Sequence, residues 1–101
     1  MLNIDRKLVT IITESVLETE LCELLESLSV SGYTVTNARG SGSRGIRSAG
    51  WSASSNVRIE IVCSQELADE IVRTVSEKYY DDYAMILFEH DVRVLRSDKF
   101  S

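Results

Sequence analysis

Four short stretches of the chain carry apolar and β-branched residues in patterns that predict β-strands. Lys7 to Thr13 is an almost continuous apolar and β-branched run, as in a strand paired on both sides within a sheet. Val57 to Ile61 alternates strictly between apolar and charged residues, which is typical of a half-buried strand. Tyr33 to Ala38 and Ala84 to Glu89 complete the set of four main strands.

From His90 onward the chain has a shorter apolar stretch and more polar residues. His90 and Asp91 predict a turn, and Val92 to Leu95 predicts a short fifth strand after it. Residues 96–101 form a polar tail.

Two stretches between the predicted strands have apolar residues at helical spacing. In the first, Ser15 and Glu18 match a capping box, and Gly32 suits the end of the connection. Its apolar positions are Val16, Leu17, Leu21, Leu24, Leu25 and Leu28. The second begins after Ser64, a good N-cap residue, and Asp81-Asp82 ends it. Its apolar face is Leu67, Ala68, Ile71, Val72 and Val75.

The order of these elements is strand, helix, strand, strand, helix, strand. It predicts an α+β, ferredoxin-like βαββαβ sandwich with both helices on one face of an antiparallel sheet. At 101 residues the chain is one domain, 1–101. The second and third strands are separated by about 17 residues, where hairpin loops usually have about 2 to 5. So long a connection is usually a binding loop or a disordered one.

Charge is distributed unevenly along the chain. The segment from Arg39 to Arg58 holds four arginines, four of the five glycines and no Asp or Glu, so it carries +4. The whole chain carries −5, so the other 81 residues carry −9. Glycine lets backbone N–H groups approach a ligand closely, and arginine binds phosphate oxygens in bidentate fashion. The composition therefore favours an anionic, phosphorylated ligand.

A Gly-x-Gly-x-x-Gly motif lies in this segment at Gly40, Gly42 and Gly45. A strand precedes it but no helix follows, so it is not a dinucleotide-binding fingerprint. The chain also lacks the Gly-Lys-Ser/Thr of a phosphate-binding P-loop. What remains is a glycine-rich nest beside Arg44 and Arg47, with a solvated hairpin loop as the alternative.

Trp51, the single tryptophan, lies inside the same polar segment. It is a candidate to bind a partner protein, to stack on a base or to pack against a neighbouring subunit. Packing of the loop onto its own domain is the alternative.

Catalytic and metal-binding constellations are not evident in the sequence. His90, the single histidine, fits a solvated turn, and Cys22 and Cys63 fit buried free thiols. No Ser-His-Asp or Cys-His arrangement is visible. We therefore expect no enzyme activity, no catalytic residue, no cofactor and no metal site.

Charge and hydropathy also limit the partners. The net charge of −5 argues against nucleic-acid binding, since phosphate contacts need a large basic surface. No apolar run reaches about 18 residues, and no signal-peptide h-region is present. We expect a cytoplasmic protein without direct membrane insertion.

The local sequence resembles that of the PII-like signalling proteins. The most specific stretch is Gly40 to Ser48, a Gly-x-Gly-Ser-Arg-x-x-Arg-Ser core. Four other stretches are also similar to the carboxysome-associated, SbtB-type branch: Lys7 to Glu14, Gly32 to Thr36, Asn56 to Glu60 and Tyr79 to Ala84. Together the matches cover most of residues 7–95.

The resemblance implies a cytoplasmic homotrimer with three clefts between subunits for an adenine nucleotide, such as AMP, ADP, ATP or cyclic AMP. The long loop, about 39–55, corresponds to the family's T-loop, which changes order with the ligand and contacts a target. In this branch the target is linked to inorganic-carbon uptake, often a bicarbonate transporter, and some members bind bicarbonate beside the nucleotide.

The resemblance also implies a set of nucleotide-binding residues. They are Gly40, Gly42, Ser43, Arg44, Arg47, Arg58, Tyr83, Ala84, Arg93 and Arg96. The glycines and Ser43 are expected to donate hydrogen bonds to phosphates, and Arg44 and Arg47 to pair with phosphate oxygens. Arg93 and Arg96 are expected to come from the neighbouring subunit.

Residues 96–101 depart from those members that end in a cysteine-bearing redox loop, so redox control through that loop is not expected. Three rival functions stay open at this point. They are a weak nucleotide hydrolase using the same cleft, a trimeric metal-binding module of the same fold, and a loop that binds RNA.

Overall fold

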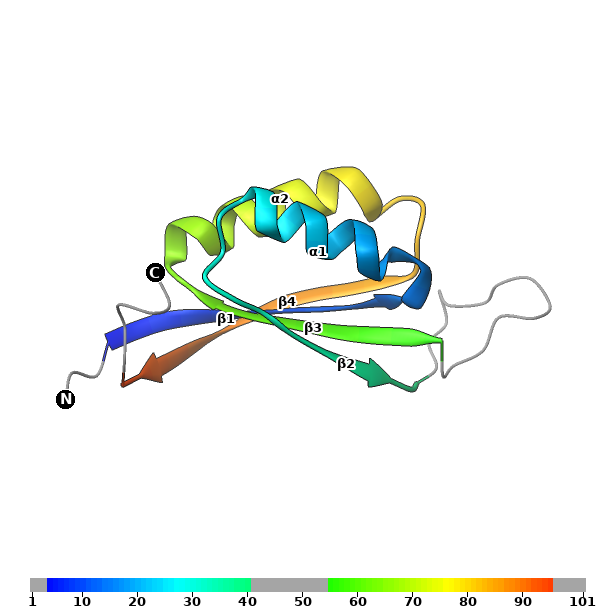
Figure 1. The fold of residues 1–101 in the computed structure, drawn as a ribbon. Coiled ribbons are helices and arrows are strands. Elements are labelled where there is room, and N and C mark those ends of the chain that lie inside the picture. The colour runs from blue at the N-terminus through cyan, green and yellow to red at the C-terminus, as the bar shows by residue number, and fades with distance from the viewer. Residues whose placement is uncertain (1–3, 41–54, 96–101) are drawn as a thin grey trace.

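The computed structural model describes residues 4–40 and 55–95, which form a four-stranded antiparallel sheet with two helices packed on one face (Figure 1). The strands are β1 (Ile4–Glu14), β2 (Thr34–Ala38), β3 (Asn56–Cys63) and β4 (Met85–Val94). The helices are η1 (Ser15–Leu17), α1 (Glu18–Ser27) and α2 (Gln65–Tyr79). This arrangement confirms the expected α+β, ferredoxin-like fold.

The strand order is β2-β3-β1-β4, so β1 lies inside the sheet and is paired on both sides. It pairs with β3 from Lys7 opposite Cys63 to Glu14 opposite Asn56. It pairs with β4 from Ile4 opposite Val94 to Thr13 opposite Met85. The central position explains why β1 reads as a continuous apolar run.

The core lies between the helices and the sheet face that they cover. Alternate residues of β1 and β3 point into it because side chains along a strand alternate between the two faces. The buried apolar residues are Val9, Ile11, Leu17, Leu21, Leu25, Val57, Ile59, Ile61, Cys63, Ala68, Ile71, Val75 and Tyr79. Strict alternation in β3, from buried Val57 to buried Cys63, confirms the predicted half-buried strand.

The C-terminal part differs from the sequence-based expectation. His90 and Asp91 lie within β4, opposite Leu8 and Lys7 of β1, and the strand continues to Val94. The predicted turn at His90-Asp91 and the separate fifth strand at Val92 to Leu95 are therefore wrong. The reason is that β1 begins at Ile4, earlier than its apolar run, and supplies pairing partners along the whole of β4.

The starts of the two helices show one correct and one wrong expectation. Ser64 caps α2, since its hydroxyl accepts a hydrogen bond of 3.2 Å from the Leu67 N–H. The capping box at Ser15 and Glu18 is wrong. The Ser15 N–H instead donates to the Ser55 carbonyl at 2.7 Å, and neither η1 nor α1 has a side-chain cap. Val16, expected on the apolar face, is 74% exposed.

The other face of the sheet is not covered by α1 or α2 (Figure 1). Residues opposite one another in the ladders share a face, so Leu8, Ile12, Ile86 and Phe88 all lie on this open face. Ile86 is 56% exposed. Thr10 lies among them, fully buried, and its hydroxyl has no hydrogen-bond partner within the described residues.

Candidate ligand-binding site

The described ends of the arginine-rich segment emerge at one end of the sheet. β2 ends at Ala38 and β3 begins at Asn56, and the two residues are paired. Asn56 is also paired with Glu14, the last residue of β1, so Gly40 and Ser55 flank the same end (Figure 1). Gly40 is exposed, and a Cβ placed there would meet nothing within 4 Å in the described structure. Within the described residues, this end of the sheet therefore leaves open space beside Gly40.

Arg58 follows on β3, two residues after this end, on the open face of the sheet. It is paired with Ile12 of β1 and with Thr36 of β2. Its side chain is 43% exposed, and its Nη2 lies 3.4 Å from Glu60 Oε2, a long contact for an ion pair. A guanidinium has five N–H donors, so this contact among the described residues leaves Arg58 donors for an anionic ligand.

Tyr83 and Ala84 lie in the connection from α2 to β4, at the same end of the sheet. The Tyr83 N–H donates to the Tyr79 carbonyl at 3.2 Å, and the two rings meet edge to face with centroids 6.0 Å apart. The Tyr79 hydroxyl donates to Glu20 of α1 at 2.9 Å. Burial, and next this hydrogen bond, raise the pKa of Tyr79 to about 12. Tyr83 is therefore held against α2 through Tyr79, which in turn bonds to α1.

Ala84 is held by two side chains from the end of β1. The Thr13 hydroxyl donates to the Ala84 carbonyl at 2.8 Å, and the Ala84 N–H donates to Glu14 Oε2 at 3.0 Å. Neither Thr13 nor Glu14 was among the residues expected at the site. A signal was present in the sequence, because a Thr-Glu pair that ends a buried apolar strand places two hydrogen-bonding side chains at the end of the sheet.

Arg93 lies at the opposite end of the sheet, where it is paired with Asp5. It follows eight residues after Met85, so about 27 Å of extended strand separates it from the Tyr83–Ala84 connection. An open hollow of about 550 Å³ lies beside it, lined by Asp5, Arg6, Lys7, Gln65, Asp91, Val92 and Arg93. One chain therefore does not bring Arg93 together with Tyr83 and Ala84.

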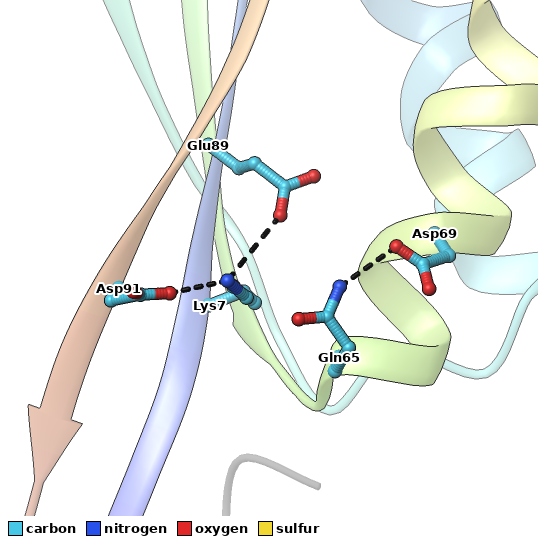
Figure 2. Close-up of polar contacts among 5 residues, drawn as sticks. All are labelled: Lys7, Gln65, Asp69, Glu89 and Asp91. Carbon is cyan, nitrogen blue, oxygen red and sulfur yellow. Dashed lines mark hydrogen bonds and ion pairs between the residues drawn. The ribbon is translucent and has the colours of Figure 1, made fainter.

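Lys7 is the centre of the charged contacts at this far end. Figure 2 shows its amine between Asp91, to which it donates a hydrogen bond, and Glu89, whose Oε1 is 3.8 Å away. The hydrogen bond to Asp91 raises the pKa of Lys7 and lowers that of Asp91. Gln65, at the start of α2, donates instead to Asp69 at 2.8 Å.

Comparison with known proteins identifies the family. The family model described as nitrogen regulatory protein P-II matches residues 6–99. This chain belongs to the nitrogen regulatory protein P-II family. A PII-like signaling protein of Thermus thermophilus is 44% identical, covers 100% of both chains and superposes with a TM-score of 0.84.

Structures of CPII, a nitrogen regulatory PII-like protein from Thiomonas intermedia, have the same fold as this P-II protein. CPII bound to ADP, AMP and bicarbonate is 23% identical, with 98% of this chain and 96% of that chain covered and a TM-score of 0.83. CPII bound to ADP and bicarbonate is 24% identical, with 99% and 98% covered and a TM-score of 0.84.

Several expected site residues of this P-II protein lie outside the described residues. They are Gly42, Ser43, Arg44, Arg47, Trp51 and Arg96. His90 is exposed on β4, and its ring lies edge to face against the Phe88 ring, with the two centroids 5.5 Å apart. Cys63 is buried and Cys22 half-buried, and neither forms a disulfide.

Residues 4–40 and 55–95 contain no group of three or more His, Cys, Asp or Glu side chains that could hold a metal ion. Within the same ranges, neither α1 nor α2 has the length and apolar character needed to span a bilayer.

Proposed function

We propose that this P-II protein is a non-enzymatic sensor that binds an adenine nucleotide (AMP, ADP, ATP or cyclic AMP) in clefts between the subunits of a homotrimer. One observation carries the proposal. The segment richest in arginine and glycine leaves and re-enters the sheet at the end where Tyr83 and Ala84 are fixed in place. Arg58, with spare donors, lies at that end on the open face.

The ligand class is supported by the chemistry of the segment and by CPII. Four arginines without a carboxylate favour phosphate, and Gly40, Gly42 and Ser43 can offer donors to it. CPII has been solved with ADP, AMP and bicarbonate, so we extend both kinds of ligand to this chain as a proposal. Bicarbonate binding would fit an SbtB-type role in inorganic-carbon uptake or metabolism.

A second copy of the chain is needed to complete the site as we propose it. Arg93 is separated from Tyr83 and Ala84 by about 27 Å of strand, so it can join them only from a neighbouring subunit. The open sheet face supports association, since it carries exposed Ile86 and a buried Thr10 hydroxyl that has no partner among the described residues. Arg96, two residues after Val94, is proposed to act with Arg93.

The remaining assignments follow from this proposal. The chain is a single PII-like domain, 1–101, whose T-loop is about 39–55 and whose tail is 96–101. Arg44 and Arg47 pair with phosphate oxygens, and Trp51 contacts a partner protein, such as a bicarbonate transporter. The protein acts in the cytoplasm and binds no nucleic acid.

Isothermal titration calorimetry tests the nucleotide. AMP, ADP, ATP and cyclic AMP are titrated into the full chain, each with and without bicarbonate. We expect micromolar binding of at least one, and a change in affinity with bicarbonate. Each of Arg44→Ala, Arg47→Ala and Arg58→Ala removes one charge-assisted contact worth about 1.5–3 kcal/mol, or roughly tenfold or more in affinity.

The matched control is Arg73→Ala, which removes an exposed arginine of α2 away from the proposed site. It should leave the affinity unchanged. If no nucleotide gives heat with a protein shown to be folded, the sensor proposal fails and the loop is better explained as reading a protein partner. If the three arginine variants all bind like Arg73→Ala, their phosphate role is wrong.

A further inference from the structure

Three consecutive residues, the last two of β1 and the first of η1, bond to two segments that are far away in the sequence. Thr13 and Glu14 hold Ala84, and the Ser15 N–H donates to the Ser55 carbonyl at 2.7 Å. Ala84 precedes β4, and Ser55 is the last residue before β3. We call Thr13, Glu14 and Ser15 the β1-end clamp.

The hydrogen-bond pattern explains why the contacts to Ala84, beside β4, come from side chains, whereas the contact to Ser55, beside β3, comes from the backbone. Next to β3, the backbone ladder reaches Glu14 opposite Asn56, and the Ser15 bond extends it by one residue. Next to β4, the ladder stops at Thr13 opposite Met85. The side chains of Thr13 and Glu14 therefore take over where the ladder ends, and they satisfy both backbone polar groups of Ala84.

This double contact fixes Ala84 in position and in orientation. Adjacent residues of a strand point to opposite faces, so Thr13 and Glu14 reach the same residue from the two sides of the sheet. Thr13 is only 2% exposed, so its hydroxyl has little access to water as a substitute partner. Hydrogen bonds of this kind span about 2.7–3.2 Å, so a shift of Ala84 by about 0.5 Å would break one or pull the end of β1 with it.

We propose that the β1-end clamp positions the Tyr83–Ala84 connection for the ligand and couples it to Ser55, the described exit of the T-loop. This inference rests on the proposed function, because it names the residues through which the nucleotide site communicates with that exit. Thr13 and Glu14 are positioning residues, since they act through Ala84. Both segments bond to the junction of β1 and η1.

The first test needs no ligand. Amide hydrogen exchange is measured by NMR at Ser15 and Ala84, with Ile71 in the core of α2 as the reference for global opening. Thr13→Val keeps the shape of the side chain but removes the donor, and Thr13→Ser keeps the hydroxyl. Glu14→Ala removes the acceptor, and Glu14→Gln keeps an acceptor oxygen.

We expect Thr13→Val and Glu14→Ala to speed exchange at Ala84 by at least tenfold and at Ser15 by at least threefold. Exchange at Ile71 should accelerate only as far as the loss of global stability in each variant requires, and by less than exchange at Ala84 and Ser15. Thr13→Ser and Glu14→Gln should resemble wild type at all three amides. Faster exchange at Ala84 with an unchanged Ser15 would overturn the coupling. Equal acceleration of exchange at Ser15 and Ile71 would also overturn the coupling, because the effect would then be global.

The second test uses ADP. We expect Glu14→Ala to weaken ADP binding about tenfold and Glu14→Gln to bind within threefold of wild type. Glu77→Ala on α2 is the control that removes an exposed carboxylate elsewhere. Unchanged ADP affinity in Glu14→Ala and Thr13→Val, with binding by wild type, would overturn the positioning role.

The two failures are distinguishable. If wild type binds no nucleotide, the proposed function fails, and the exchange experiment alone decides whether the clamp couples the two segments. If wild type binds and the variants match it in both experiments, the clamp inference fails while the proposed function stands.

Discussion

The two ends of β1 are held in different ways. At the end next to the T-loop, Thr13 and Glu14 bond to the backbone of Ala84, and the Thr13 side chain is buried. At the far end, Lys7 forms charged contacts with Glu89 and Asp91 (Figure 2), and an open hollow lies beside Lys7 and Asp91. Buried hydrogen bonds to backbone fix geometry, whereas exposed ion pairs contribute little to stability. The end that we assign to the ligand is therefore the one with the more precisely held backbone.

The largest effect should come from a charged substitution on the open face of the sheet, near the T-loop end. Ile86→Glu places a carboxylate on an apolar surface that we propose to be buried between subunits. Analytical ultracentrifugation at micromolar concentration should show trimer for wild type and monomer for this variant, with nucleotide affinity lost as well. Val16→Glu is the control, because Val16 is exposed on η1, off the sheet face. A wild-type monomer, or a trimeric Ile86→Glu, would contradict the proposed interface.

The next effect compares the two ends directly through stability. Thr13→Val leaves the part-buried Ala84 carbonyl without its donor and should lower the free energy of unfolding by about 1–3 kcal/mol. Lys7→Met removes exposed ion pairs and should cost clearly less. Urea unfolding of both variants measures the difference. An equal or larger loss in Lys7→Met would show that the far end is the firmer one.

The difference between local and long-range contacts explains which parts of the fold could be predicted from the sequence. Alternation in β3, the apolar run of β1 and the Ser64 cap depend on local sequence, and each was predicted correctly. The capping box at Ser15 failed because its N–H bonds to Ser55, 40 residues away in sequence. The fifth strand failed because His90 and Asp91 find partners on β1. Local sequence patterns do not indicate these long-range pairings.

The candidate site shows the same limit. A resemblance of motifs indicated Arg58, Tyr83 and Ala84, and the structure brings them to one end of the sheet. It does not bring Arg93 there, because β4 runs away from that end. The role of Glu14 in holding Ala84 depends on a contact across 70 residues, which spacing alone could not show.

A smaller effect separates the two cysteines. Burial, and next the charge of Glu89, raise the pKa of the Cys63 thiol to about 11, and Cys63 lies opposite Lys7 in the ladder. At pH 8 its thiolate fraction would be on the order of 10⁻³, so its reaction with a disulfide reagent should be slow. Half-buried Cys22 should react first, giving one fast thiol per folded chain and two in urea. Cys22→Ser should remove the fast phase, and two fast thiols in the folded wild type would contradict the burial of Cys63.

The smallest effect is the pH dependence of the far end. Its ion pair lowers the pKa of Asp91 below the ordinary 3.8 and raises that of Lys7 above 10.5. The carboxylate therefore stabilises the fold above about pH 4, and this contribution is lost as the pH falls through its lowered pKa. The Lys7 contribution is complete below about pH 10 and is lost as the pH rises through its raised pKa.

The stability difference between wild type and Asp91→Asn should therefore be constant from about pH 5 to 9 and should shrink in acid, and salt should reduce it throughout. Urea unfolding midpoints, measured in acid as well as from about pH 5 to 9, provide the test. Thr13→Val is the reference, because a hydroxyl-to-carbonyl bond does not titrate, so its difference from wild type should not change in acid. If the Asp91→Asn difference instead grew below pH 4, the ion pair would not be its source. If it did not respond to salt, the far end would be held by something other than exposed charge, and the contrast between the two ends of β1 would need another explanation.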